Sequence, residues 1–222
     1  MINMKTVFSI SFFCLVSVAL FSQSSPNTMT VKVDAKEFKS EPRRVTIGRY
    51  EYITGNVINP DKSLRFWIAT IDGSQISESG KYLVIGEDDN YNKDKAFQAE
   101  WLTGKYKGIA AIKYVEETKS PRLEYHVGES TFNGESIDVQ LPGDGFINLT
   151  FTSTLDGSWW KESASTTAFG GVGRIMNKME DKAVTSASGY DQNIDPEGNG
   201  YKKQKTLDKI LLTEGVLKLK LK

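Results

Sequence analysis

The chain has 222 residues, and all-β units of this length commonly remain single domains. Its 28 Lys and Arg residues balance 28 Asp and Glu residues, so the chain as a whole lacks the positive charge that draws proteins to nucleic acid or anionic membranes. The single histidine excludes a zinc site built on two histidines, and the single cysteine, Cys14, excludes a disulfide framework within the chain.

Residues 1–22 have the layout of a secretory signal peptide, in which Lys5 precedes an apolar run and small polar residues follow it. The run of about fifteen apolar residues is shorter than the roughly 20 that a membrane-spanning helix needs. We expect cleavage after Ser22, with Ser24 as the alternative. The product would be a single β-rich domain of residues 23–222, either periplasmic or secreted.

Alternation of apolar and polar residues dominates the remaining chain and predicts antiparallel strands with one face in the core. The clearest example is FINLTFTSTL at 146–155, whose apolar side chains alternate with Asn and Thr. RLEYHVG at 122–128 repeats the pattern and places His126 on the polar face. Three further segments, SLRFWIATI, KYLVIG and GIAAIKYV, are apolar on both faces and predict strands in the middle of a sheet.

Turn sequences such as NPDK at 59–62 and PGDG at 142–145 separate these strands. We count about eight to ten strands with mostly short connections, which predicts an all-β domain, either an antiparallel sandwich or an up-and-down barrel. The C-terminal VLKLKLK places its leucines inward and its lysines outward. We expect it to form an edge strand whose lysines discourage further pairing.

Residues 156–206 interrupt the alternation as a long insertion between the last two strands, rich in Gly, Ser, Thr, Asn and Asp. Long loops in compact domains are often functional. Apolar residues recur at helical spacing over 172–183, so we expect one short helix there. It would close one end of a barrel or lie on a sheet.

Trp159 and Trp160 stand at the start of this insertion and are the candidate ligand-binding residues. Neighbouring residues of an extended chain point to opposite faces, so one ring would face the core and the other the solvent. An exposed ring would offer a platform to a ligand. The alternative is that both rings pack the insertion against the sheets.

The segment DQNIDPEGNG at 191–200 places oxygen-bearing side chains on alternate residues, as calcium loops do. Pro196 stands where a helix-loop-helix calcium site has glycine, and the bidentate carboxylate that closes such a loop is missing. Two interpretations stay open: a looser calcium site at Asp191, Asn193 and Asp195, or a hydrogen-bonded turn. The sequence indicates no other cofactor.

Two motifs resemble those of small exported β-rich domains from Bacteroidota, which form families of unknown function with a lipocalin-like appearance. Their strand motif matches Gly145, Ile147, Thr150, Phe151 and Leu155, and their final-strand motif matches Leu212, Thr213, Gly215 and Val216. Asn148 replaces a glycine that is usual in the first motif. The resemblance implies a β-rich fold and an exported setting, and it supplies no catalytic or binding residue.

These features predict an exported, non-enzymatic β-domain that binds a small apolar molecule or a cell-surface component, with no nucleic-acid partner and no stable membrane insertion. Two alternatives stay open: a carbohydrate-binding module that uses exposed Trp residues, and a hydrolase that works through carboxylates. A cavity inside the barrel favours the first hypothesis, a flat aromatic strip the second, and two inward-facing carboxyls at catalytic separation the third.

Overall fold

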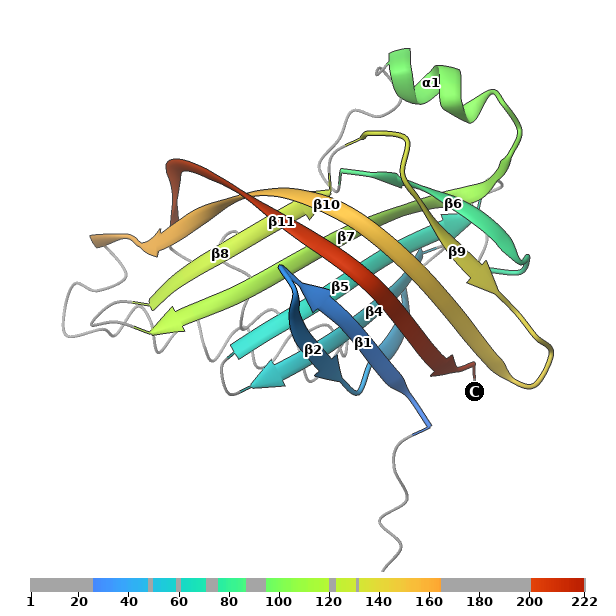
Figure 1. Ribbon diagram of the computed structural model, residues 1–222, viewed down its shortest axis with the longest axis horizontal. Coiled ribbons are helices and arrows are strands. Elements are labelled where there is room, and N and C mark those ends of the chain that lie inside the picture. Colours follow the sequence, from blue (N-terminus) through green and yellow to red (C-terminus); the bar gives the residue numbers. More distant parts are fainter. Residues whose placement is uncertain are drawn as a thin grey trace, which may run out of the picture.

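A computed structural model describes residues 26–47, 50–58, 61–70, 76–86, 95–119, 123–130, 132–164 and 201–221. They form one eleven-stranded sheet and one short helix (Figure 1). The strands are β1 (Thr28–Val33), β2 (Lys36–Ser40), β3 (Arg43–Ile47), β4 (Tyr50–Ile58), β5 (Asp61–Thr70), β6 (Gly80–Ile85), β7 (Tyr106–Lys119), β8 (Leu123–Ser130), β9 (Ser136–Gln140), β10 (Phe146–Glu162) and β11 (Tyr201–Lys220), and the helix is α1 (Lys95–Trp101). The all-β prediction is confirmed, with eleven strands where about eight to ten were expected.

Three sequence predictions fall outside the described residues. They are the signal peptide at 1–22, the helix at 172–183, and the calcium site at Asp191, Asn193 and Asp195. The helix that the structure does describe, α1, lies between β6 and β7. No helix in the described part of the chain is long and apolar enough to cross a membrane.

The last two strands are longer than the sequence pattern indicated. β10 continues to Glu162 and β11 begins at Tyr201, so the segment between them is 163–200 instead of 156–206. Gly157 lies within β10, where the Val127 carbonyl of the neighbouring strand leaves no room for a Cβ atom. Glycine inside a strand often marks such a close backbone approach.

β11 is an interior strand, which corrects the prediction of an edge strand at the C-terminus. Its residues 212–218 pair with β1 on one side, and its whole length pairs with β10 on the other. Leu217 and Leu219 are buried, while Lys218 and Lys220 are exposed, as the alternation predicted. The lysines therefore lie on an outer face of the sheet rather than along its edge.

β6 and β7 run parallel, whereas the other pairs among the described strands are antiparallel. A parallel pair needs a crossover connection, and α1 lies in that connection. The helix places Phe97 in one buried cluster with Leu83, Ile85 and Ile109 on the outer face of the sheet. Since a second cluster covers the opposite face, β5, β6 and β7 are buried on both sides, which confirms the prediction from their continuous apolar sequences.

The sheet forks between β7 and β10. Near one end β8 alone bridges the two long strands, pairing with both. Near the other end β6 pairs with β7 and β9 pairs with β10, so two strands fill the same gap. β7 and β10 therefore spread apart along their length, and the sheet is strongly curved there (Figure 1).

Two side chains form hydrogen bonds with the backbone at the point where the strand pairing changes. The Ser130 hydroxyl, at the end of β8, donates to the Ile85 carbonyl (2.5 Å) and accepts from the Ile112 amide (3.3 Å). The Glu135 carboxylate accepts from the Thr154 amide of β10 at 3.2 and 3.3 Å. Main-chain groups that lose a strand partner at the fork thus find a side-chain partner, as buried backbone groups must.

The sheet folds over onto its own apolar face. β1 and β2 lie across β4 and β5 in Figure 1, and all four strands contribute buried side chains to one hydrophobic cluster. Gly55 of β4 leaves the space that Ser40 of β2 and Met29 of β1 occupy. The two ends of one sheet thus act as the two layers of a sandwich.

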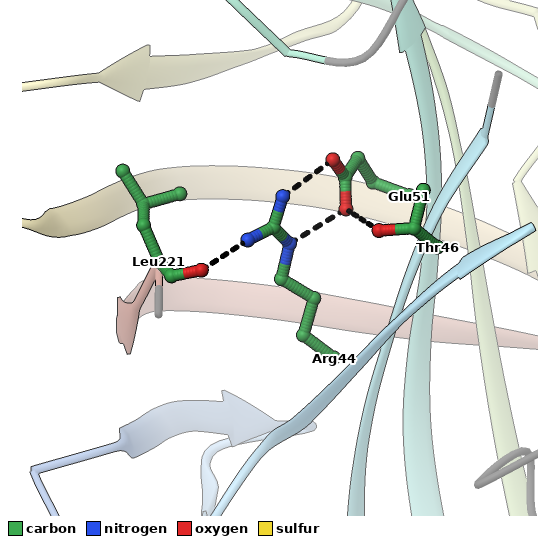
Figure 2. A network of polar contacts seen from close by, with 4 residues as sticks. All are labelled: Arg44, Thr46, Glu51 and Leu221. Carbon is green, nitrogen blue, oxygen red and sulfur yellow. Dashed lines mark hydrogen bonds and ion pairs between the residues drawn. The ribbon is translucent and has the colours of Figure 1, made fainter.

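A buried ion pair joins the ends of the folded sheet. Arg44 of β3 donates two hydrogen bonds of 2.6 Å to the Glu51 carboxylate of β4 and a third of 2.7 Å to the Leu221 carbonyl beyond β11 (Figure 2). Thr46 donates to the same carboxylate at 3.2 Å. Glu51 is fully buried, so its charge depends on these donors for compensation.

Replacing Arg44 with Met should destabilise the fold by about 3 kcal/mol or more, because the Glu51 carboxylate is left buried without its cation. The double variant Arg44→Met/Glu51→Met should be more stable than the single one, since no buried charge remains. Urea denaturation measures both free energies of unfolding. Equal values for the single and double variants would contradict this account.

The two motifs that resemble the Bacteroidota families meet in space at Phe151 and Gly215. These residues are register partners of β10 and β11, and the Phe151 ring lies where a Cβ atom of residue 215 would be. The ring also packs edge-on against Phe66 at a centroid distance of 4.8 Å. Glu214, with a φ of 53°, forms the bulge beside this contact.

We expect Gly215→Ala to lower the free energy of unfolding by about 1–3 kcal/mol, because the added methyl group overlaps the Phe151 ring. In a Phe151→Leu background the same substitution should cost clearly less. Thermal or urea unfolding of the four proteins gives the coupling. An alanine penalty that is independent of residue 151 would show that the glycine is needed for another reason.

Candidate functional site

The strand register places a row of polar and aromatic side chains across four strands on the inner face of the sheet. Lys62 of β5 lies opposite Glu116 of β7, Glu116 opposite His126 of β8, and His126 opposite Trp159 of β10. The row lies on the β8 side of the fork. The apolar core fills the same face elsewhere, so the row marks where the interior becomes polar.

Glu116 is the acceptor at the centre of this row. It forms an ion pair with Lys62 Nζ (2.8 Å) and accepts a hydrogen bond from the Tyr114 hydroxyl (2.7 Å). Burial alone would raise the pKa of the Glu116 carboxyl, but the hydrogen bonds from Lys62 and Tyr114 outweigh it and hold the pKa below its ordinary value. Burial and the bond to Glu116 raise the pKa of Tyr114, so Tyr114 stays protonated and remains a donor.

The turn between β1 and β2 covers one side of the row. Asp34 and Ala35 have φ values of 47° and 65°, the left-handed backbone of a two-residue hairpin turn. The Asp34 carboxylate accepts from the Leu211 amide, and the Asp34 amide donates to the Leu211 carbonyl, both at 2.9 Å. These bonds fix the turn to β11.

A cavity of about 80 Å³ lies between this turn and the row. The residues that line it are Val33, Asp34, Lys36, Glu37, Phe38, Lys62, Tyr114 and Glu116. The lining combines apolar residues, including Phe38 packed edge-on against Tyr114, with charged residues, including the paired Lys62 and Glu116. The volume suits a group of a few heavy atoms, since one water needs roughly 10–15 Å³ on this measure.

His126 is buried beside the cavity, 6% exposed, although the sequence predicted it on a solvated face. Its ring stacks on Trp159 at a centroid distance of 4.4 Å and an interplanar angle of 21°. Nε2 lies 3.0 Å from the Asp208 carboxylate but makes no hydrogen bond to it, so the ring N–H is not aligned with that oxygen. Burial lowers the pKa of His126, and Asp208, Glu116 and Asp34 oppose this shift without cancelling it.

Trp159 and Trp160 point to opposite faces of β10. Trp159 faces inward onto His126. Trp160 packs outward against Tyr125 and its neighbours, and Lys203 Nζ lies 5.6 Å from the centroid of its ring. Each ring therefore has a protein group on one face, and the two do not form a single aromatic strip.

The sequence pattern gave no reason to group Lys62, Tyr114 and Glu116. Lys62 stands in a predicted turn, NPDK, and Glu116 is one of two adjacent glutamates. Only the pairing of β5 with β7 and of β7 with β8 makes them neighbours of His126. Among the described residues, no group of three or more His, Cys, Asp or Glu side chains is arranged to hold a metal ion.

Comparisons with protein-family models, with curated proteins and with solved structures found no match to this chain.

The imidazole of His126 should titrate below its ordinary value of 6.5, because the folded protein favours the neutral ring. Its pKa is lower in the folded than in the unfolded state. The corresponding stability is therefore complete above the unfolded pKa and is lost as the pH falls toward the folded one. As the chain has one histidine, a single imidazole signal in NMR spectra reports the titration directly.

Replacing His126 with Phe keeps a flat ring on Trp159 and removes the titrating group. This variant should lose less stability than the wild type as the pH falls below about 6.5. The contribution of Glu116 is lost only at lower pH, around and below its ordinary pKa of 4.5, so the two effects separate. A wild-type imidazole that titrates above 6.5 would contradict the prediction.

Proposed function

We propose that the chain is a non-catalytic binding protein that takes a small hydroxylated molecule, or the hydroxylated end of a larger one, into the cavity between the β1–β2 turn and the Lys62–Glu116 pair. The observation that carries this proposal is that three polar side chains of the cavity, Lys62, Tyr114 and Glu116, are already held in place by one another. Lys62, Tyr114 and Glu116 form one connected set, and Asp34 is fixed to β11. A preorganised site loses little side-chain entropy when a ligand binds.

The polarity of the cavity supports a hydroxylated ligand. Lys62 supplies an ammonium donor and Glu116 supplies a carboxylate acceptor, and a hydroxyl group satisfies both kinds. Phe38 and Val33 offer apolar contact to the carbon skeleton. The apolar ligand expected from the sequence has less support, because the protein's own side chains fill the apolar inner face in the described part of the chain.

The same contacts argue against a hydrolase that uses Glu116 as its general acid. Such a residue needs a raised pKa in order to carry a proton at neutral pH. Lys62 and Tyr114 hold Glu116 in the ionised form. A binding role is consistent with a carboxylate that keeps its charge and accepts hydrogen bonds.

The setting that we propose for this activity is outside the cytoplasm, periplasmic or secreted, on the strength of the signal-like sequence at 1–22 and the resemblance to exported β-rich domains.

Ligand-observed NMR with a panel of monosaccharides and short hydroxy acids tests the proposal, with a medium-chain fatty acid as the apolar probe. Members of the hydroxylated group should bind the wild-type protein. Lys62→Gln should weaken their binding by about tenfold or more, since a hydrogen bond to a charged group contributes roughly 1.5–3 kcal/mol.

Lys81→Gln is the matched control, because Lys81 also lies near a carboxylate, Asp138 at 3.8 Å, but has no part in the cavity. It should leave binding unchanged. Binding of the fatty acid alone, or of hydroxylated probes with equal affinity to both variants, would overturn the proposal.

A further inference from the structure

The outer face of β11 carries exposed aliphatic side chains in line with lysines. Among the described residues four large hydrophobic side chains are exposed, and three of them lie on β11: Leu207 (80%), Leu211 (47%) and Val216 (49%). The fourth, Leu102 (79%), follows α1. A single exposed aliphatic side chain is ordinary in a protein. Three on one strand indicate a surface that contacts another molecule.

The pairing with β10 places these side chains on one face with lysines. Leu207, Lys209 and Leu211 lie opposite Ser158, Asp156 and Thr154, and Val216, Lys218 and Lys220 lie opposite Thr150, Asn148 and Phe146. We call these six residues of β11 the outer row. The alternate residues of the strand, such as Ile210 and Leu212, are buried in the core.

β11 concentrates positive charge in a chain that is neutral overall. Its sequence holds six lysines and two acidic residues, Asp208 and Glu214, and all six lysines are exposed. Asp208 points inward to His126, and Glu214 forms an ion pair with Lys32 of β1 (2.6 Å). Within the outer row, Lys209 lies 3.3 Å from Asp156, while Lys218 lies over the Phe146 ring.

We propose that the outer row binds the surface of a lipid bilayer that contains anionic lipids. The lysines would lie at the level of the negatively charged headgroups, and Leu207, Leu211 and Val216 would reach the boundary of the acyl chains. Lysine near an anionic membrane contributes about 1 kcal/mol per residue, and this attraction falls off within a Debye length. The binding is peripheral.

A partner that lies on the outer face of β11 fits the outer row better than an acidic peptide that adds a strand at its edge. Strand addition would use the edge of β11 that faces away from β10, over 202–210, where no described strand pairs with it because β1 pairs with 212–218. The row continues past that edge to Lys218, which pairs with Thr28 of β1, and to Lys220, whose amide donates to Asn27 Oδ1. A partner that contacts both halves must therefore lie on the face of the strand.

Co-sedimentation of residues 23–222 with vesicles tests the proposal. The protein should bind vesicles of equimolar phosphatidylglycerol and phosphatidylcholine, and binding should weaken as salt is raised. Lys218→Glu/Lys220→Glu should reduce the partition coefficient by about tenfold or more, and Leu207→Ser should reduce it several-fold. All of these side chains are exposed, so the variants should keep the wild-type melting temperature.

Two matched controls address the rest of the surface. Leu102→Ser removes an exposed leucine that is not in the outer row, and Lys81→Glu reverses an exposed lysine on β6. Both should bind anionic vesicles as the wild type does. Equal binding to pure phosphatidylcholine, no binding, or equal losses in row and control variants would overturn the proposal.

A synthetic acidic peptide in an extended conformation distinguishes a protein partner. If it protects the amide hydrogens of 203–210 from exchange while anionic vesicles leave the row unaffected, the surface is a strand-docking edge and the bilayer proposal is wrong. Lys62→Gln should leave vesicle binding unchanged, so this proposal and the binding cavity fail or succeed independently.

Discussion

The described part of this chain forms one sheet with an apolar cluster on each face. The larger of these two faces is covered because the sheet folds onto itself. The hydrophobic effect favours removal of this face from water. Among the described residues, the apolar surface that covers it belongs to the other end of the same sheet. Bringing the ends together buries Glu51, which is tolerated because Arg44 neutralises it and ties β3 and β4 to the end of β11.

The fork between β7 and β10 accompanies the sharp curvature of the sheet. One strand fits between β7 and β10 at one end and two at the other, which spreads the long strands and leaves backbone groups to be satisfied by Ser130 and Glu135. The single strand on the narrow side is β8. It places His126 between Glu116 and Trp159, and so the curvature of the sheet also assembles the polar row.

Side chains alternate between the two faces of β10 and β11, and the two faces differ in their chemistry. Inward, Trp159 and Asp208 complete the polar end of the interior. Outward, lysines and exposed aliphatic residues share one face. A neutral composition conceals this arrangement, because the acidic partners are distributed between the interior and neighbouring strands.

The sequence by itself determined the all-β class, the inward and outward faces of segments such as 146–151, and the burial of β5, β6 and β7 on both faces. These properties follow from periodicity, which is local, since successive side chains of a strand point to opposite faces. It did not show that Phe151 and Gly215 touch. The tertiary structure alone decided that β6 and β7 are parallel, that β11 is interior, and that His126 is buried. These depend on register and strand order, in which residues such as Lys62, Glu116 and His126 meet through pairings that no local pattern encodes.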